Sequence, residues 1–159
     1  MEAIRNMTQV QKDKINMAIK NGNDISDLIE GWNISGMYLA SAKISRFNRV
    51  QENMTNINFV GATIGEEGKI TNLCGSNFMG SNFQSAKFLG KIWFRGCDLR
   101  NCNFNNAWLP EVEYQRADLR NIQLCDAVFR IGSKSGFGAK LEWKLFEQLA
   151  QYLELDIQK

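Results

Sequence analysis

The stretch "CGSNFMGSNFQSAKF", residues 74–88, places Phe78, Phe83 and Phe88 five residues apart. An amphipathic helix repeats its apolar residues about every 3.6 positions, and a half-buried strand about every 2. A period of five fits neither element alone. It fits a five-residue segment whose first and third side chains face inward, as in a short strand, followed by a corner that restarts the count.

The same period continues on both sides of this stretch. The central apolar positions, with one extra residue after Phe88, are Leu73, Phe78, Phe83, Phe88, Phe94, Leu99, Phe104, Leu109, Tyr114, Leu119, Leu124 and Phe129. An upstream run consists of Ile34, Leu39, Ile44, Met54, Phe59 and Ile64, interrupted by Arg49. Self-similarity at a short fixed period predicts a solenoid, in which neighbouring coils bury each other's apolar faces.

A small residue is frequent two positions before each centre, and Asn or Asp is frequent just before it. The repeats "CDLRN", "CNFNN", "ADLRN" and "SNFMG" therefore resemble those of the pentapeptide-repeat family, and the resemblance extends from Trp32 to Arg130. It implies an all-β solenoid, a right-handed quadrilateral β-helix with one pentapeptide per side and four per coil. About five coils, spaced about 4.8 Å apart, would form the rod.

The five-residue period also predicts which residues stack in successive coils. One column is Leu39, Phe59, Phe83, Phe104 and Leu124, a second is Met54, Phe78, Leu99 and Leu119, and a third is Ile64, Phe88, Leu109 and Phe129. An outward column of Asn58, Asn82 and Asn103 is expected to form an amide ladder with hydrogen bonds between coils.

Two departures from the period predict local irregularity. The long step from Ile64 to Leu73 predicts a loop that leaves the rod at residues 65–68, "GEEG". Large residues also occupy the small positions of the first coil, and these are Trp32, Met37, Phe47, Glu52 and Ile57. We therefore expect the first coil to be wider or irregular.

Four segments are expected along the chain: an N-terminal helical cap (1–31), the β-helix (32–131), a connector (132–138) and a C-terminal helix (139–159). "TQVQKDKINMAIKNG" predicts a helix capped by Thr8 and Gln11 that ends near Asn21 and Gly22. The last segment is amphipathic, with leucines at fourfold spacing: Leu141, Leu145, Leu149 and Leu153. Both helices would cap the ends of the rod, although the C-terminal helix could instead pair with its copy in a homodimer.

Composition selects no class of partner. The net charge is +2 with 23% charged residues, and no run of eighteen apolar residues or leader sequence occurs, so a cytoplasmic protein without membrane contact is expected. The chain contains no histidine, the commonest general base and a common zinc ligand. The four cysteines form no C-x-x-C pair and are expected to be thiols.

Candidate sites for chemistry have simpler structural explanations. Cys97 and Cys102 should face inward on adjacent sides, while Cys74 and Cys125 point outward, so they do not converge on a metal. "GSKSGFGAK" (132–140) lacks the order of a phosphate-binding loop and is better explained as a connector.

Two carboxylate pairs, Glu66 with Glu67 and Glu111 with Glu113, would need a cleft for acid–base catalysis, and a convex rod provides none. We therefore predict no catalytic residue, no metal, no cofactor and no small-molecule substrate, and hence no enzyme.

The candidate partner contacts lie on the surface of the rod. They are Glu66 and Glu67 in the predicted loop, and Arg95, Arg100, Arg116 and Arg120. The arginines form a basic patch that could bind phosphate or an acidic protein. Because Asp98 and Asp118 share a side with Arg100 and Arg120, the alternative is a set of solvated ion pairs.

The expected function is that of a non-catalytic interaction or scaffold module. The resemblance implies an alternative, because some pentapeptide-repeat proteins look like duplex DNA, bind type II topoisomerases such as gyrase and protect them from quinolones. Residues 32–130 hold 8 acidic and 11 basic residues, which opposes mimicry of DNA, so a topoisomerase contact would have to use the "GEEG" loop. Direct nucleic-acid binding by the arginines is a third hypothesis.

Overall fold

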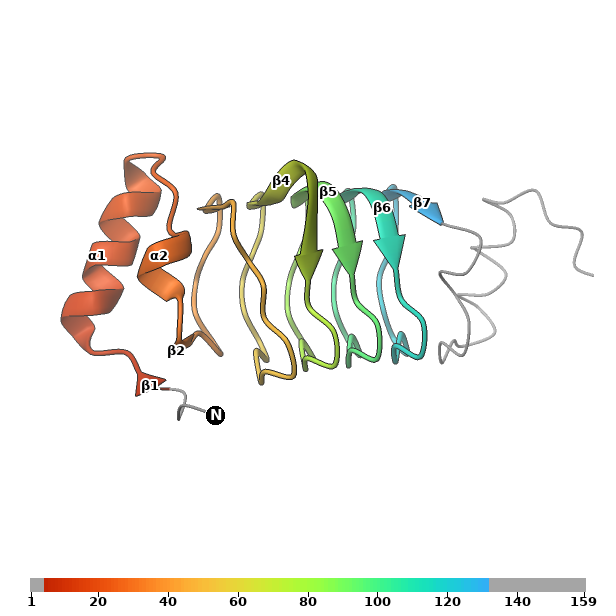
Figure 1. Ribbon diagram of the computed structural model, residues 1–159, viewed down its shortest axis with the longest axis horizontal. Helices are drawn as coiled ribbons and strands as arrows, with labels where there is room; N and C mark the ends of the chain where they lie inside the picture. The colour runs from red at the N-terminus through yellow and green to blue at the C-terminus, as the bar shows by residue number, and fades with distance from the viewer. Residues whose placement is uncertain (1–4, 132–159) are drawn as a thin grey trace, which may run out of the picture.

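The computed structural model describes residues 5–131, which form stacked coils behind a helical N-terminal segment (Figure 1). Its elements are β1 (Arg5–Asn6), α1 (Gln9–Lys20), α2 (Ser26–Ile29), β2 (Trp32–Asn33), β3 (Lys43–Ile44), β4 (Thr63–Asn72), β5 (Lys87–Trp93), β6 (Trp108–Glu113) and β7 (Val128–Ile131). Strands β3 to β7 form one parallel sheet in chain order, and β1 pairs in parallel with β2. The predicted β-solenoid is confirmed, while the connector (132–138) and the C-terminal helix (139–159) lie outside the described residues.

Helix α1 begins after Thr8, whose hydroxyl accepts from the Gln11 backbone N–H at 3.4 Å while the Gln11 side chain accepts from the Thr8 N–H at 2.7 Å. Strand β1 and the short α2 were not predicted, and Asp24 already pairs in parallel with Lys43, upstream of the predicted first coil. Of the helices within residues 5–131, none combines the length and the apolarity needed to cross a bilayer.

Each five-residue side ends in a β-turn that restarts the alternation of side chains. The Ala86 N–H donates to the Phe83 carbonyl at 2.9 Å, and Ser85 between them has a φ of 56°. A positive φ at the third residue of a turn favours Gly and Asn. The residue two positions after the centre is accordingly glycine or, in most other sides, a short polar residue; examples are Gly36, Ser41, Asn56, Gly61, Gly75, Gly80, Gly96, Asn101, Asn106 and Asn121.

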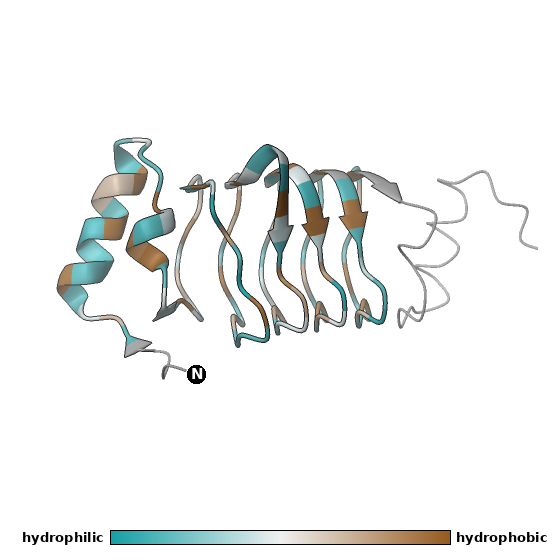
Figure 2. Ribbon diagram, in the orientation of Figure 1, coloured by the Kyte–Doolittle hydropathy of each residue, from teal (hydrophilic) through white to brown (hydrophobic). Residues whose placement is uncertain are grey.

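The core consists of columns of equivalent residues from successive coils. Parallel bridges join Tyr38, Asn58, Asn82, Asn103 and Gln123, and the residues that follow them stack inside as predicted. The Phe83 ring lies 4.9 Å from that of Phe59 and 4.6 Å from that of Phe104, with an interplanar angle of 11° in both pairs. Figure 2 shows a further set of hydrophobic bands at one level in β4, β5 and β6, on a different side of the coils from these phenylalanines.

Small inward residues bind the backbone of the preceding coil. Ser76 and Ser81 donate their hydroxyls to the carbonyls of Arg49 at 2.8 Å and Met54 at 3.2 Å. Where the small position holds Ser, the side chain fits beside the stacked rings and also donates a hydrogen bond, whereas Ala86 and Ala107 at the same position only fill the space. In the next coil, the thiols of Cys97 and Cys102 make the equivalent contacts to Leu73 at 2.9 Å and Phe78 at 3.1 Å.

The predicted amide ladder between coils is wrong. The side-chain oxygens of Asn58 and Asn82 accept from the backbone N–H of Val60 and Gln84, each at 3.0 Å and two residues further along the same coil. Asn103 makes the same contact to Asn105 at 2.9 Å. Since a short Asn side chain reaches this local N–H without strain, it closes an Asx turn before the corner.

The predicted irregularity of the first coil is limited to the side that contains Phe47, where the Asn72 N–H donates to the Asn48 side chain at 2.8 Å instead of to a backbone carbonyl. Elsewhere the first coil pairs with the next in the same register as later coils. Arg49 occupies a central position and is only 5% exposed. A buried guanidinium needs acceptors, and it finds the carbonyls of Trp32 at 3.2 Å and Ile29, with Glu52 at 2.6 Å. Arg49 thereby ties the end of α2 to the first coil.

The extra residues after Ile64 form a bulge inside β4, seen where β4 rises above its neighbours in Figure 1. Gly65 pairs with Leu89 and Ile70 with Lys91, so residues 66–69 face the single residue Gly90. Residues 66–70, here called the β4 bulge, are exposed, whereas Gly65 is buried. The excursion thus begins one residue later than predicted.

Gly90 supports this bulge from below. It has a φ of 72°, and a Cβ there would collide with the carbonyl oxygens of Glu66 and Lys69. We expect Gly90→Ala to destabilise the protein by about 2 kcal/mol or more, since it adds a backbone clash to the strain of a left-handed residue. Thermal and urea unfolding measure the loss.

Gly96→Ala is the matched control, because Gly96 has a φ of 66° but its Cβ would meet only Gly75 Cα, at 4.0 Å. It should cost about 1 kcal/mol from backbone strain alone. Equal losses in the two variants would show that the bulge does not rest on Gly90.

Candidate interaction site

Two stacked ion pairs occupy one side of the rod. Arg100 binds Asp98 through two contacts, Nε to Oδ1 at 2.9 Å and Nη2 to Oδ2 at 2.6 Å, and Arg120 binds Asp118 at the same two distances. Asp98 and Asp118 are bridge partners in adjacent coils, and Arg100 Nε lies 3.8 Å from Asp118 Oδ2. The aspartates follow from the repeat, which places Asn or Asp just before the centre, so these four residues form a neutral ladder.

A second charged group, here called the corner cluster, contains Lys91, Trp93, Arg95, Glu111 and Glu113. Lys91 Nζ lies 2.7 Å from Glu113 Oε1 and 3.1 Å from Glu111 Oε1. Arg95 Nε donates to the other Glu113 oxygen at 2.7 Å, and its guanidinium carbon stands 4.4 Å from the centre of the Trp93 ring. The two cations and two anions of the cluster cancel.

These ion pairs lower the pKa values of the acids and raise those of the bases. The Lys91 hydrogen bond, followed by that of Arg95, outweighs partial burial and lowers the pKa of Glu113 to about 2. The Arg100 hydrogen bond likewise lowers the pKa of Asp98, and the pKa values of Lys91, Arg100 and Arg120 are raised by their acidic partners. All of these groups are charged at neutral pH.

The predicted basic patch is therefore largely a set of ion pairs. Arg95, Arg100 and Arg120 each hold a carboxylate, while Arg116 is exposed at a corner, with a φ of 60°, and has no ion-pair partner within residues 5–131. A phosphate group would have to displace carboxylates from three of the four arginines. The geometry thus weakens the nucleic-acid hypothesis.

The predicted acidic contacts behave differently. Glu66 and Glu67 are exposed in the β4 bulge, and neither forms an ion pair with any residue of the described range. Their position is set by the backbone, because Gly65 packs closely on Leu89 of β5 and Gly90 of β5 packs closely under Glu66 and Lys69. Their side chains do not hold them in place.

The cysteines do not converge on a common site. Burial raises the pKa values of Cys97 and Cys102 to about 12, so both are neutral hydrogen-bond donors in the core. Cys74 is half-buried, and exposed Cys125 lies 3.3 Å from Asp126, which raises its pKa. Among residues 5–131, no group of three or more Cys, Asp or Glu side chains could hold a metal ion.

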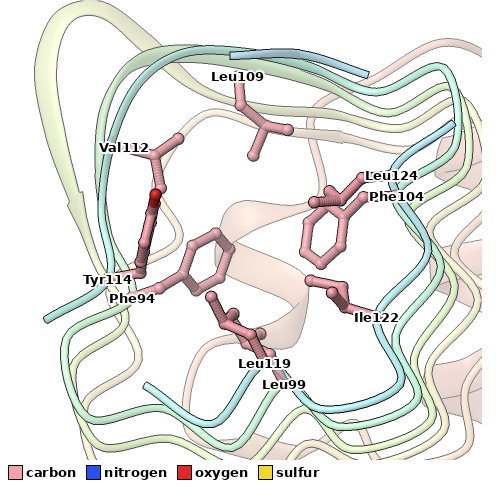
Figure 3. Close-up of a pocket in the computed structure, with 9 residues that line it drawn as sticks. All are labelled: Phe94, Leu99, Phe104, Leu109, Val112, Tyr114, Leu119, Ile122 and Leu124. Atoms are coloured by element: carbon pink, nitrogen blue, oxygen red, sulfur yellow. The ribbon is translucent and has the colours of Figure 1, made fainter. Parts of the chain in front are cut away.

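An apolar cavity of about 50 Å³ lies inside the last described coils (Figure 3). Its lining residues point toward the axis from all sides, and they include Phe94, Phe104, Leu109, Leu119 and Leu124. Ligand sites usually enclose several hundred cubic ångströms and contain a few polar groups. This cavity is better explained as a gap in the packing of the core.

Two charged residues were missed by sequence reasoning. Lys91 lies beside the extra residue of β5, and only the pairing of Lys91 with Glu111 brings it to both carboxylates. Arg49 interrupts the apolar repeat, and the structure shows it to be a buried guanidinium with backbone acceptors.

Glu113 offers a direct test of the corner cluster. We expect a carboxyl pKa of about 2 by NMR titration, an increase toward the ordinary 4.5 in Lys91→Met, and a smaller increase in Arg95→Met. Because the folded pKa is depressed, the stabilisation is present above pH 4.5 and is lost as the pH falls toward 2. The same Glu113 titration in wild type and Lys91→Met would contradict the assigned cause.

None of the known protein-family models matches the sequence, and no curated protein matches it. Among solved structures, the chain is similar to the pentapeptide repeat protein Rfr23 from the cyanobacterium Cyanothece 51142, at 14% identity over 68% of this chain and 90% of that one, with a TM-score of 0.35.

It is also similar to AT2G44920, a pentapeptide repeat protein from the Arabidopsis thaliana thylakoid lumen, at 17% identity over 79% of each chain and a TM-score of 0.29. QnrB1, a plasmid-mediated fluoroquinolone resistance protein, matches at 10% identity over 79% of this chain and 93% of that one, with a TM-score of 0.23. Its own five-residue sides, left-handed corners and parallel coils make this chain a β-solenoid with a five-residue repeat.

Proposed function

We propose that this protein is a non-catalytic interaction module that binds another protein through the β4 bulge. The observation that carries the proposal is the exposed acid pair Glu66 and Glu67, which has no ion pair within residues 5–131 and lies on a backbone packed against Gly90. Elsewhere along the coils, Asp98, Glu113 and their neighbours are already neutralised by cations. Within residues 5–131, the bulge places two adjacent exposed carboxylates without ion pairs at one point of the surface, where a partner could bind them.

The geometry of the bulge suits recognition. Gly65 and Gly90 let its backbone pack directly on β5, so little conformational freedom is lost when a partner binds. Ile70, which is also exposed, adds an apolar contact beside the two carboxylates. A complementary partner would present basic side chains around an apolar residue.

The wider architecture that we propose is a right-handed rod of about five coils spaced by about 4.8 Å, with helices at both ends. No catalysis, cofactor or small-molecule substrate is part of the proposal, and the location remains the cytoplasm. The solvated arginine, Arg116, could add a secondary contact.

A second candidate is protection of a type II topoisomerase such as gyrase, with the acidic bulge as the contact. On the side of the described coils that carries Asp98, Arg100, Asp118 and Arg120, the neutral ladder provides no acidic stripe to imitate duplex DNA. A gyrase supercoiling assay with a quinolone present separates the two candidates. Restored supercoiling would favour the topoisomerase, and no protection at micromolar protein would exclude it.

Charge reversal of the bulge tests the main proposal. We expect the Glu66→Lys, Glu67→Lys double variant to lose a protein that the wild type retains from a cell extract, because both carboxylates would now repel its basic groups. Quantitative mass spectrometry of the retained proteins gives the measurement.

Glu30→Lys is the control, since Glu30 is also exposed and has no ion pair within residues 5–131. It should retain the same partner, and matching circular dichroism would show that the fold is intact. A protein retained equally by wild type, control and double variant would exclude the bulge as the contact.

A homodimer through the C-terminal helix is a separate proposal. It rests on the spacing of Leu141, Leu145, Leu149 and Leu153. Light scattering at several concentrations should give a dimer for the full chain and a monomer for a version ending after Gly138. Two folded monomers would contradict it.

A further inference from the structure

A groove of about 360 Å³ separates α1 from the first coil, at the end of the molecule opposite β7 (Figure 1). Its walls come from α1, from the β1–β2 pair and from the turn that leads into the first coil, and they include Lys12, Asn16, Asn33, Ser35 and Tyr38. The volume is within the usual range for a ligand site. The groove is distant in sequence from the β4 bulge and does not depend on the function proposed for it.

One wall of the groove is an unpaired backbone edge. Asn58 donates its N–H to the Met37 carbonyl at 2.9 Å and accepts from the Leu39 N–H at 2.7 Å, so these groups of the first coil point toward the second coil. In a parallel ladder, the N–H and C=O of the residue between them point the opposite way. That residue is Tyr38, and neither its N–H nor its C=O has a partner within residues 5–131.

The position of Tyr38 is that of a sheet edge. Asn82 bonds to Ile57 and Phe59 in the way that Asn58 bonds to Met37 and Leu39, and this pattern is repeated along the column. At Tyr38 the preceding side is missing, because the chain instead forms α1. An extended peptide could supply that side, which is the hydrogen-bonding mode of strand addition.

The side chains around this edge define the chemistry of the peptide. Lys12 is the one charged residue among the nine that line the groove, and it has no ion pair within the described part of the chain. The amide of Asn16 is equally without a hydrogen-bond partner there, whereas Asn33 is occupied by Asn6 and Ser35. The Tyr38 side chain is 68% exposed at the rim.

We infer that this groove binds an extended peptide segment that carries an acidic side chain. The peptide adds beside Tyr38, accepting from its N–H and donating to its C=O, and places its carboxylate near Lys12. Asn16 supplies a further amide contact. The site thus binds the peptide backbone at the Tyr38 edge of the first coil and binds the acidic side chain at Lys12 of α1.

The probe is the peptide Ac-Gly-Glu-Gly-NH2, titrated into the 15N-labelled full chain and followed by NMR. We expect saturable shifts at the Tyr38 and Gly36 amides. The Gln counterpart should bind about fivefold more weakly, because it lacks the ion pair with Lys12, and the analogue methylated at every peptide nitrogen should not bind, because it cannot donate to Tyr38.

The variants separate this site from a general charge effect. Lys12→Glu should reverse the preference between the Glu and Gln peptides, whereas Lys20→Glu, on the same helix but outside the groove, should leave it unchanged. The bulge variant Glu66→Lys, Glu67→Lys should bind the peptide normally, so loss of either site can be recognised independently.

Three results would overturn the inference: no shift at the groove amides at millimolar peptide, shifts confined to another surface, or normal binding of the methylated analogue.

Discussion

Hydrogen bonds between successive coils are the constraint on which the rest of this structure depends. Phe59 and Phe83 donate their N–H groups to Asn82 and Asn103, each at 2.7 Å, and the same pattern recurs around the rod. Equivalent residues are thereby held about 4.8 Å apart. A side chain that recurs at the same position of the repeat therefore lies next to its equivalent in the neighbouring coil. This produces the columns of stacked rings, of Ser and Cys donors, and of Arg–Asp pairs.

Residues in excess of the five-residue period can be accommodated at only one kind of position in such a structure. A coil that kept them in its wall would break the register of every side that follows, so they leave the wall at a corner. In the β4 bulge, residues 66–69 lie opposite Gly90, and pairing with β5 resumes at Ile70. Function can be added at a corner because each coil contacts only its neighbours, and the cost stays local.

The five-residue period predicts much of this fold, since register alone decides which backbones pair. It predicts the columns and the neighbourhood of the bulge. It fails for Asn58, Asn82 and Asn103, whose side chains turn to their own coil, because register does not set side-chain torsions. It does not predict the acceptors of Arg49 in the first coil, which are the carbonyls of Trp32 in β2 and of Ile29 at the end of α2.

The candidate sites also differ in whether the sequence alone predicts them. Exposure of Glu66 and Glu67 follows from their place in an insertion, and the neutralisation of Arg100 and Arg120 follows from the aspartates beside them. Lys91 and Tyr38 could not be found in this way. The role of Lys91 depends on a one-residue shift in β5, and that of Tyr38 on the direction in which α1 departs from the stack.

The neutral ladder also affects how quickly a charged macromolecule would reach that side of the rod. A surface whose guanidinium groups are bonded to carboxylates projects little field beyond a Debye length of about 8 Å at physiological salt. Encounter with a charged macromolecule on this side would then not be accelerated over distance, and association there would proceed at the 10⁵–10⁶ M⁻¹s⁻¹ that is roughly typical of unsteered pairs. For this rod, changes in affinity would be expressed mainly in how long a complex lasts.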